Sequence, residues 1–328
     1  MPKHDFLTIG GATEDISFCT NEATMVDNKK DVLRQKLMAF EYGAKLNVEK
    51  SYSTFGGGAA NAAVTFAKLG FRAAAILAVG SDNRGQDIVN NLKKRKVGTD
   101  FVQKIPNIET GFTFFIVGRD KEHIGFSNRA ANQKLVIGKK ELGEMNNSKW
   151  IYITSLSGKW PEILNNVFKA KAKIVWNPGH VQLHAGFSAL GKFLAKTEIL
   201  TVNKDEAIEL VVSNPEHRNK NNRFLNDSRN LLKIIKGYGP KIVVITNGPL
   251  GADAFDGKNF YHQDIVVAKK RVDTTGVGDA FGSTFVAGLE IFKGDIAKAM
   301  YAAIKNAAAV ISEMGAQNGQ LSRKDLLK

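Results

Sequence analysis

The sequence predicts an α/β fold built on a mainly parallel sheet, and three observations support this. Strand-like apolar runs alternate with helical patterns over most of the 328 residues. This rhythm is typical of β-α-β units, in which a helix connects one parallel strand to the next. Two regions, about 16–56 and 100–128, carry strand-like alternation with no helix between them. The apolar content of 43% is ordinary for a globular chain, so we expect one domain spanning 1–328.

The α/β elements are read from the period of their apolar residues. An Ala-rich helix and an amphipathic helix follow the first two strands, and the same alternation resumes near residue 150. The expected strands are 5–10, 72–79, 150–153, 174–176, 199–202 and 241–245, and the expected helices are 59–69, 82–94, 161–171, 187–194, one from Lys204, and 225–236.

The two regions without helices are expected to form a lid. Their alternating runs, such as Thr113–Val117 and His123–Ser127, could pair as a small antiparallel sheet that projects from the α/β body. These lid segments are about 16–56 and 100–128.

The C-terminal third begins with a hairpin and ends with two helices. Residues 252–261 read as a hairpin because Asp256-Gly257 suits a type I′ turn. The run IVVAKKRV (265–272) looks strand-like, and helices are expected at 278–292 and 296–314. The polar stretch 214–226 is the best prediction for a surface loop.

The composition argues against nucleic-acid and membrane partners. The net charge is +14, but the basic residues are spread along the chain, with the densest runs at 93–96 and 269–271. No aromatic residues interleave with them as in a nucleic-acid platform. The apolar runs are too short to span a bilayer. The single cysteine, Cys19, cannot form an intrachain disulfide, and the chain starts directly in a strand, so the expected location is cytoplasmic.

The strongest chemical signal is the Gly-rich turn DTTGVGDAFG (273–282), which opens a long helix. Free N–H groups at a helix start and the helix dipole together bind anions. An acidic residue in that turn, Asp279, makes sense if its carboxylate must reach a nucleophile that attacks a bound phosphate. The positive helix end should keep Asp279 ionised, ready to accept a proton. A plain helix N-cap with turn glycines remains the alternative interpretation.

Two further features suit a hydroxylated ligand. Glycines precede Asn61 at the start of the Ala-rich helix, and the amide of Asn61 can both donate and accept hydrogen bonds. Asp15 follows the first strand, where a carboxylate could accept bonds from two neighbouring hydroxyls. Packing glycines and a solvated turn carboxylate are the alternative interpretations.

Taken together, these motifs resemble the ribokinase family of carbohydrate kinases, also called the PfkB family. DTTGVGDAFGSTF (273–285) matches the C-terminal signature, and GGGAANAAVTFAKLG (56–70) matches the N-terminal one. Between them lie an N-x-x-E at 203–206 and a T-x-G-x-x-G at 246–251. The match runs in order from about residue 5 to 320.

The resemblance implies a ribokinase-like three-layer sandwich with a small antiparallel β lid. It implies transfer of the γ-phosphate of ATP to a hydroxymethyl group of a small sugar or sugar-like substrate of the fructose, ribose or sugar-acid type. The implied cofactors are ATP and Mg²⁺, with K⁺ as an activator in many members. In some members the lid is also a homodimer interface.

The resemblance also implies a role for each matching residue. Asp279 would be the catalytic base, and the amides of Gly276, Val277 and Gly278 would form the anion hole. The substrate would be held by Asp15, Gly57, Gly58 and Asn61. The nucleotide site would include Asn203, Thr246, Gly248, Gly251 and Asn306. Glu206, with Asn203, would organise Mg²⁺ mostly through water, and Asp273 and Thr275 resemble part of the K⁺ site.

Some positions depart from ribokinases and bear on the substrate. Ribokinases usually carry lysine where Gly58 stands and asparagine where Thr13 stands. Arg129 lies in a segment that resembles fructokinases and ketodeoxygluconate kinases, where an arginine contacts the substrate; an exposed lid arginine is the other interpretation. Asn177 ends a strand, where ligands of open α/β sheets bind.

Other functions stay open on the sequence alone. A nucleoside kinase of the same family would need a purine-sized pocket lined by lid aromatics, namely Phe40, Tyr42, Phe112, Phe114 and Phe126. A non-catalytic binding protein could keep the fold, although intact Asp279, Gly276 and Gly278 argue against it. A dinucleotide-binding oxidoreductase is disfavoured because no G-x-G-x-x-G opens a helix after the first strand.

Overall fold

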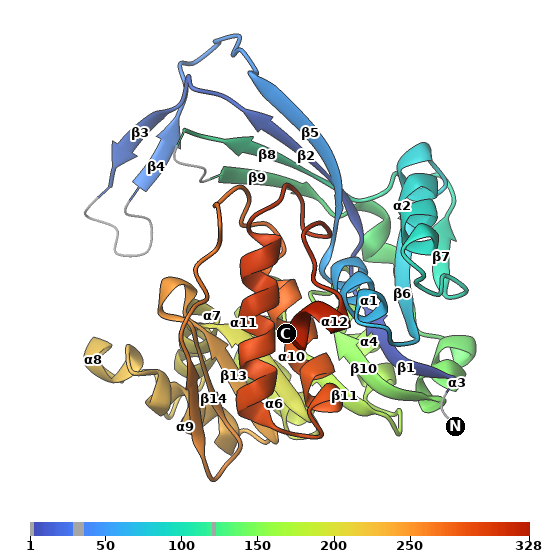
Figure 1. Ribbon diagram of the computed structural model, residues 1–328, viewed down its shortest axis with the longest axis vertical. Helices are drawn as coiled ribbons and strands as arrows, with labels where there is room; N and C mark the ends of the chain where they lie inside the picture. The colour runs from blue at the N-terminus through green and yellow to red at the C-terminus, as the bar shows by residue number, and fades with distance from the viewer. Residues whose placement is uncertain (1–2, 29–35, 120–122) are drawn as a thin grey trace.

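The computed structural model describes residues 3–28, 36–119 and 123–328. Within this part of the chain the body is built on a nine-stranded sheet with the order β15-β14-β13-β12-β11-β10-β1-β6-β7. The strands from β7 to β13 in this order pair in parallel, and β14 and β15 form an antiparallel hairpin at the edge (Figure 1). The strands are β1 (His4–Ile9), β6 (Ala73–Gly80), β7 (Val102–Ile105), β10 (Ser148–Ile153), β11 (Lys173–Trp176), β12 (Ile199–Asn203), β13 (Ile242–Thr246), β14 (Ala252–Phe255) and β15 (Phe260–Gln263).

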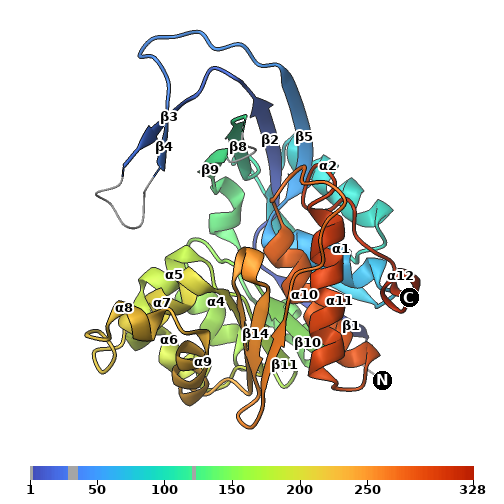
Figure 2. The same ribbon diagram turned by 60° about the vertical axis from the view of Figure 1, so that its left-hand side comes forward.

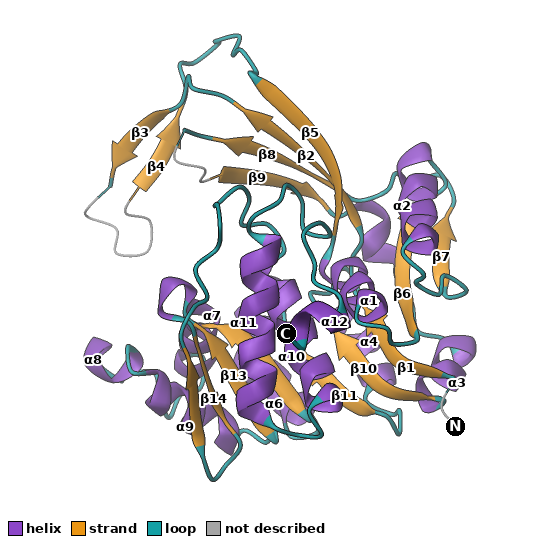
Figure 3. Cartoon of the chain, viewed as in Figure 1, coloured by secondary structure: helices purple, strands orange, loops and turns teal. Residues whose placement is uncertain are grey.

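Helices surround this sheet, as Figure 3 shows. The α-helices are α1 (Gly58–Lys68), α2 (Asn83–Lys94), α3 (Lys139–Asn146), α4 (Trp160–Val167), α5 (His180–His184), α6 (Gly186–Leu194), α7 (Lys204–Val212), α8 (Asn222–Leu225), α9 (Ser228–Gly237), α10 (Val277–Ile291), α11 (Ile296–Val310) and α12 (Arg323–Leu326). Two short 3₁₀ turns are η1 (Ala130–Lys134) and η2 (Gly248–Leu250).

The central strands are buried on both faces, which gives three layers. Alternate side chains of β10 enter opposite cores: Ile151 and Ile153 pack with the core of α4, α6, α7 and α9, and Trp150 and Tyr152 pack with that of α1, α10 and α11. In the second core the rings of Phe6 and Phe66 stack with centroids 3.9 Å apart. Burial on both faces explains why these strands read as continuous apolar runs rather than as alternation.

The strand order creates a switch point at the centre of the sheet. From β1 the chain moves to β6 and β7 on one side, whereas β10 to β13 lie on the other side. In open α/β sheets, ligands bind where the order reverses, beyond the carboxyl ends of the strands. The segments after β1 and β10 lie at this place.

The lid is a second sheet with the order β5-β2-β8-β9, and it stands above the body (Figure 2). Its β2–β5 and β8–β9 ladders are antiparallel, and the β2–β8 ladder is parallel. A separate ribbon, β3–β4, continues from it. The lid strands are β2 (Thr13–Cys19), β5 (Lys50–Gly56), β8 (Phe112–Val117) and β9 (His123–Asn128), and the ribbon strands are β3 (Thr24–Asp27) and β4 (Lys36–Ala39). Parts of the lid segments predicted at 16–56 and 100–128 lie outside the described residues.

The structure corrects the sequence expectations at four places. Residues 102–105, expected in the lid, form β7 and extend the main sheet in parallel to β6. The run 265–272 is not a strand. In the β14–β15 hairpin, the first residue of β14, Ala252, pairs with Gln263, so β14 offers no partner to the residues that follow Gln263. The expected loop 214–226 includes α8, and α9 begins at Ser228 rather than at 225, since the Asp227 carboxylate caps it by accepting from the Arg229 N–H.

None of the described helices combines the length and the apolar character that crossing a membrane requires.

Candidate functional site

The two Gly-rich motifs meet at the switch point. Gly57 has φ +90°, a conformation that favours glycine, and a Cβ there would lie 2.5 Å from Ala12 Cα. The start of α1 therefore packs directly against the segment that follows β1. From the first turn of α1, Asn61 Nδ2 donates to Asp279 Oδ2 over 2.8 Å. Residues 218 positions apart in the chain are thus brought into one site.

Gly58 closes the space between these motifs. A Cβ at this position would lie 2.9 Å from Thr154 Cβ and 3.2 Å from Asp279 Oδ1. Thr154 directly follows β10, so the walls around Asp279 come from α1, α10 and the end of β10. The position tolerates no side chain without a shift in its neighbours.

The segment before α10 forms an anion cradle. Gly276 is the N-cap of α10 with φ +74°, in the left-handed region that glycine adopts most easily. The Asp273 carboxylate holds this turn by accepting from the N–H of Thr275 and the N–H of Gly315, each over 2.9 Å. At Gly278 a Cβ would meet nothing within 4 Å, so the first turn of α10 is open to a ligand. The N–H groups of a helix start and the helix dipole favour a bound anion there, although the Val277 N–H also makes a long contact of 3.4 Å to the Thr274 carbonyl oxygen.

Two cavities share this open turn. The larger, of about 500 Å³, has mostly apolar walls and is bordered by Thr246, Gly248 and Gly251. The smaller, of about 210 Å³, reaches Asp279. The remaining residues of the smaller cavity are Asn177, Thr201, Val202, Asn203, Glu206, Thr246, Gly276, Gly278 and Phe281. An apolar chamber that continues into a polar one at a helix start suits a ligand with a flat apolar group and several anionic groups.

Asn203 and Glu206 lie at the start of α7 and hold each other in a capping box. The Asn203 side chain accepts from the Glu206 N–H, and Glu206 Oε2 accepts from the Asn203 N–H. Burial raises the pKa of Glu206 above its usual range. Asn177 lines the same cavity, and its Nδ2 donates to the Thr201 carbonyl oxygen.

The environment of Asp279 differs from the expectation based on the helix dipole. Asp279 is half-buried, and burial raises the pKa of its carboxyl; the hydrogen bond from Asn61 lowers it by a smaller amount. The loss of water around the carboxyl therefore outweighs the hydrogen bond from Asn61. A raised pKa brings a carboxylate closer to the range in which it accepts and returns protons efficiently.

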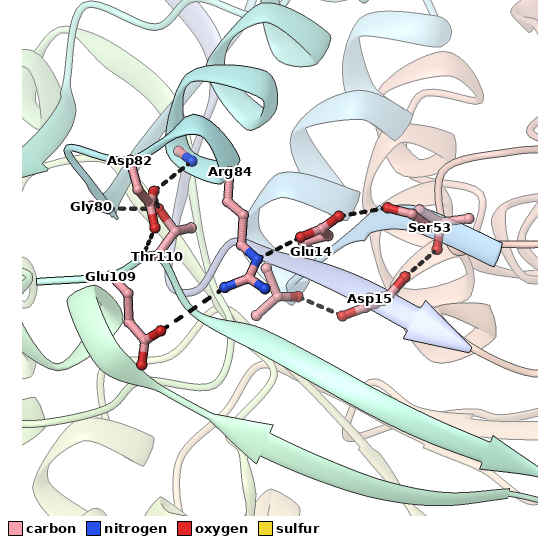
Figure 4. Close-up of polar contacts among 11 residues, drawn as sticks. Glu14, Asp15, Ser53, Gly80, Asp82, Arg84, Glu109 and Thr110 are labelled. Carbon is pink, nitrogen blue, oxygen red and sulfur yellow. Dashed lines mark hydrogen bonds and ion pairs between the residues drawn. The ribbon is translucent and has the colours of Figure 1, made fainter. Parts of the chain in front are cut away.

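Asp15 lies on the inner face of the lid sheet, at its root. Asp15, which Figure 4 labels, is buried, and its carboxylate accepts from Thr13 Oγ1 over 2.8 Å. The strand register pairs Asp15 with Thr54 and Thr113. Burial raises the pKa of Asp15 to about 6, and the nearby carboxylates of Asp273 and Asp279 add to the shift. This row of hydroxyl and carboxylate groups close to Asp279 suits a polyhydroxylated ligand.

Two of the predicted site residues lie differently from the rest. Arg129 is exposed at the N-cap of η1, and its side chain has no hydrogen bond or ion pair with another described residue. Asn306, expected beside the nucleotide base, is fully buried and does not border the larger cavity. Its amide donates to Thr284 Oγ1 and accepts from the Leu321 N–H, so it holds the core together; Ile304, Ala307 and Ala308 from α11 line the cavity instead.

Sequence reasoning missed a group of residues that shape the site from a distance. Gln317 donates to Asn61 Oδ1 over 3.0 Å, and the Asn132 amide exchanges two hydrogen bonds with the backbone of Ala12. Both residues are buried amides in segments with no repeating pattern. The only local signal for Gln317 is its position two residues after Gly315, where an uncharged polar residue follows a possible glycine turn.

Three of the lid aromatics expected around a purine, Phe112, Phe114 and Phe126, face away from Asp15. The ladder β8–β9 pairs Phe114 with Phe126 and Thr113 with Ser127, so the phenylalanines occupy the face opposite Asp15 and Thr113. Phe112 shares that outer face, where the Arg84 guanidinium lies 4.6 Å from its ring centroid. Tyr42 is fully exposed. These four residues therefore do not line the purine-sized pocket that would favour a nucleoside kinase.

The fold and the site together define an open α/β protein with an anion-binding helix start, a carboxylate beside it and a lid. A family model described as pfkB family carbohydrate kinase matches residues 26–323. The chain therefore belongs to this family and is a carbohydrate kinase.

Curated relatives and solved structures agree with this assignment. A ribokinase from Dictyostelium discoideum is 27% identical over 278 residues, covering 80% of this chain and 86% of that protein. An ATP-dependent 6-phosphofructokinase from Thermoanaerobacterium thermosaccharolyticum is 25% identical over 294 residues, covering 83% and 85%. The Arabidopsis thaliana ribokinase structure complexed with ribose and ATP has a TM-score of 0.78 at 20% identity, covering 99% of this chain and 97% of that one. A Burkholderia thailandensis nucleoside kinase in complex with inosine has a TM-score of 0.79 at 18% identity, covering 98% and 94%.

Proposed function

We propose that this kinase transfers the γ-phosphate of ATP to a hydroxymethyl group of a small sugar or sugar-like substrate, with Asp279 as the general base. The observation that carries the proposal is the 2.8 Å hydrogen bond between Asn61 and Asp279, because it joins the sugar-side motif to the anion cradle. A base must lie within reach of both the attacking hydroxyl and the phosphate. Asp279 lies at that junction.

In this reaction Asp279 takes the hydroxyl proton while the alcohol oxygen forms its bond to the γ-phosphorus and the bond to the β-phosphate oxygen breaks. The backbone N–H groups of Gly276, Val277 and Gly278 would stabilise the charge on the transferring group. Phosphoryl transfer depends mainly on positioning and charge stabilisation. The loss of one such donor typically slows catalysis about 10²- to 10³-fold.

ATP would occupy the two connected cavities. The larger one offers an apolar chamber for the adenine beside Thr246, Gly248 and Gly251, and the smaller one leads the phosphates towards Asp279. The Arabidopsis ribokinase structure with ATP and a Cryptococcus neoformans ribokinase structure in complex with ADP support nucleotide use in this fold.

The polar cavity also fits Mg²⁺. Among the described residues no three acidic, histidine or cysteine side chains gather as a metal cluster. The Glu206 carboxylate and the Asn203 amide, which border this cavity, suit Mg²⁺, because this ion usually binds one or two carboxylates, waters and substrate phosphates. Glu206 and Asn203 would hold the ion mainly through water, and the ion would neutralise charge on the phosphates.

Asp273 and Thr275 remain our proposed part of a K⁺ site. Each Asp273 oxygen accepts one backbone N–H and keeps a further lone pair. A cation beside this carboxylate would stabilise the turn that forms the anion cradle. Activity that depends on K⁺, and not on Na⁺ at equal ionic strength, would support this part of the proposal.

Asp15, Gly57, Gly58 and Asn61 would hold the substrate, and the exposed Arg129 could reach a carboxylate or phosphate on it. We favour a sugar-like substrate over a nucleoside. The inner lid face near Asp15 carries hydroxyls, whereas Phe112, Phe114 and Phe126 lie on the outer face. Two aromatic residues, Phe115 and Tyr52, share the inner face further along the lid, beside Ser17. Because the structure is also similar to a nucleoside kinase from Burkholderia thailandensis, nucleosides are included in the substrate screen described below.

The outer lid face supports a further part of the proposal, a homodimer. Phe18, Phe114 and Phe126 cluster there, with the rings of Phe18 and Phe114 stacked 6.0 Å apart. Phe126 is 58% exposed, so a second copy could bury it.

The proposed function is tested by an ADP-release screen over sugars, sugar acids, sugar phosphates and nucleosides, with and without K⁺. We expect one polyhydroxylated class to stimulate ADP release strongly above the rate with water alone. Product analysis should place the phosphate on a primary hydroxyl. Preferred phosphorylation of nucleosides would replace the sugar assignment, and no stimulation by any acceptor would favour a non-catalytic binding protein.

A further inference from the structure

A chain of four hydrogen bonds leads from helix α2 to the carboxylate of Asp279. Three amide side chains take part, and each donates with its NH₂ group to the next member. The bonds are Arg95 Nε to Asn91 Oδ1 (3.0 Å), Asn91 Nδ2 to Gln317 Oε1 (2.7 Å), Gln317 Nε2 to Asn61 Oδ1 (3.0 Å) and Asn61 Nδ2 to Asp279 Oδ2 (2.8 Å). We call these five residues the amide relay.

The two ends determine the direction of the relay. A guanidinium can only donate, so the Asn91 atom facing Arg95 must be the oxygen. The Asn91 amide group then presents NH₂ to Gln317, which in turn presents NH₂ to Asn61. An ionised Asp279 can only accept, which agrees with the same direction from the other end. No amide in this row can flip without leaving two oxygens, or two NH₂ groups, face to face.

Because the relay is buried, reversing the direction of its hydrogen bonds would cost free energy. The side chains of Asn61 and Gln317 are each 3% exposed, so a lost partner cannot readily be replaced by water. A buried polar group left without a partner costs more than the bond itself contributes. Hydrogen bonds arranged head to tail also strengthen one another in a poorly solvated interior.

Arg95 anchors two segments at once. Beyond Asn91, its Nη1 donates to the Gln317 carbonyl oxygen over 2.9 Å, and its Nη2 donates to Asn318 Oδ1. The same loop reaches the anion cradle through the Gly315 N–H, which donates to Asp273. The sequence places Arg95 within a basic run that reads as solvated, but its guanidinium is partly buried and bonded into the interior.

We propose that Asn91, Arg95 and Gln317 are positioning residues that make Asn61 present its NH₂ group, and not its oxygen, to Asp279. This inference rests on the proposed role of Asp279 as the base. If Asn61 turned over, its carbonyl oxygen would face the carboxylate, and the ionised form of Asp279 would lose its donor. None of the three residues touches the reacting atoms.

The other charged or titratable groups that face Asp279 do not replace this donor. Asp15 from β2, Tyr152 from β10 and Glu206 from α7 all interact electrostatically with Asp279. Two of them are acids, and the third is a neutral phenol whose pKa is raised by burial. The bond from Asn61 is therefore the contact through which the chain favours the ionised base.

The inference is tested with Gln317→Met, which has a similar length but no donor. The acid limb of the kcat/KM profile should move upward by about 0.5 to 1 pH unit. A whole hydrogen bond to a charge corresponds to about 1 to 2 pH units, and this variant removes only the contact that fixes the direction of Asn61. The rate at high pH should recover towards that of the wild type. Asn91→Leu, one bond further from Asp279, should produce a smaller shift in the same direction. The matched control is Asn318→Ala, which removes a contact of Arg95 on the same loop but outside the relay, and its acid limb should stay in place.

A melting-temperature cycle tests the relay without using catalysis. In Asp279→Asn, the residue at 279 can donate as well as accept, so the direction of the relay no longer matters. Gln317→Met should therefore lower Tm at neutral pH by at least twice as much in the wild-type background as in Asp279→Asn. Equal losses in both backgrounds, together with an unmoved acid limb, would overturn the relay even if Asp279→Asn is inactive. If Asp279→Asn keeps its activity, the proposed function fails, and unequal Tm losses still support the relay. If Gln317→Met does not fold, Asn91→Leu takes its place in both arms.

Discussion

At the scale of single residues, the site depends on unusually short distances between backbone, side chains and carboxylates. Gly58 lies against Thr154 and Asp279 with no room for a Cβ at ordinary distances. Burial raises the pKa of Asp15, and the nearby carboxylates of Asp273 and Asp279 add to this shift. Such an arrangement costs stability and persists where function needs it.

Gly58→Ala should impair catalysis more than folding. The new Cβ would push against Thr154 Cβ and towards Asp279 Oδ1, so the base would move by a few tenths of an ångström. We expect kcat/KM to fall at least about tenfold, since displacement of a catalytic group is expensive. Steady-state kinetics measure this. Gly143→Ala in α3, where a Cβ meets nothing within 4 Å, is the control and should gain about 0.5 to 1 kcal/mol of stability. A Gly58→Ala enzyme as fast as the control would argue against tight packing around the base.

Asp15→Asn should stabilise the protein in a pH-dependent way. The pKa of Asp15 in the folded protein is raised from 3.8 to about 6, so the folded state holds this proton more tightly than the unfolded chain does. The ionised carboxylate therefore costs stability above pH 6, and the cost disappears below pH 4. The variant should gain on the order of 3 kcal/mol in unfolding free energy at pH 8 and little at pH 3 to 4. Denaturant unfolding at both pH values checks this, and a gain independent of pH would show that the charge is not the cause.

At the scale of elements, the start of α2 connects the main sheet and its helices to the lid strands β2 and β8, close to where these strands begin. Asp82 caps α2 by accepting from the Gly85 N–H, and it also accepts from the N–H and Oγ1 of Thr110 just before β8 (Figure 4). In the same first turn of α2, Arg84 Nε donates to Glu14 of β2 over 2.7 Å. Glu14 is next to Asp15 in β2, so the orientation of β2, which carries the proposed substrate residue Asp15, depends on helix α2.

Asp82→Ala should destabilise this connection. The change removes an N-cap and leaves both Thr110 donors without their acceptor, so we expect a loss of about 1–2 kcal/mol in unfolding free energy. The hydrogen bonds hold the pKa of Asp82 below its usual value, so the loss should shrink as the pH falls through that pKa. Denaturant unfolding at pH 7 and at pH 3 measures both effects. Asp82→Asn keeps one acceptor and should lose less; equal losses in the two variants would contradict the capping role.

At the scale of the whole molecule, the alternation of apolar strands and helices was enough to predict a mainly parallel sheet covered by helices, and the resemblance to a family implied the three layers. The C-terminal motif also led to Asp279 and the cradle before α10. The sequence could not reveal which side of the lid the phenylalanines occupy, because the register of β8 against β2 sets it. Nor could it reveal that Gln317 contacts Asn61, since nothing local marks two amides 256 positions apart. Asn306 was predicted to lie beside the nucleotide base from its position in the chain. In the structure it lies on the face of α11 that packs into the core, so it is buried and does not border the cavity.

The proposed dimer is also a property of the whole molecule. Phe126→Glu places a charge on the outer lid face, where a second copy would be packed, and should convert a dimer to a monomer. Light scattering after size-exclusion chromatography at micromolar concentration measures this. Leu327→Glu changes an equally exposed side chain, 59% against 58%, near the C-terminus and should leave the dimer intact. A monomeric wild-type protein would refute the interface.

The most direct test of the account is Asp279→Asn, measured for both turnover and ATP binding. The substitution keeps the shape of the side chain and removes its ability to take a proton. We expect kcat to fall by at least about 10³-fold. The dissociation constant for ATP should stay within about threefold of that of the wild type, because the nucleotide cavities are intact. Turnover within tenfold of the wild type would contradict the assignment of Asp279 as the base.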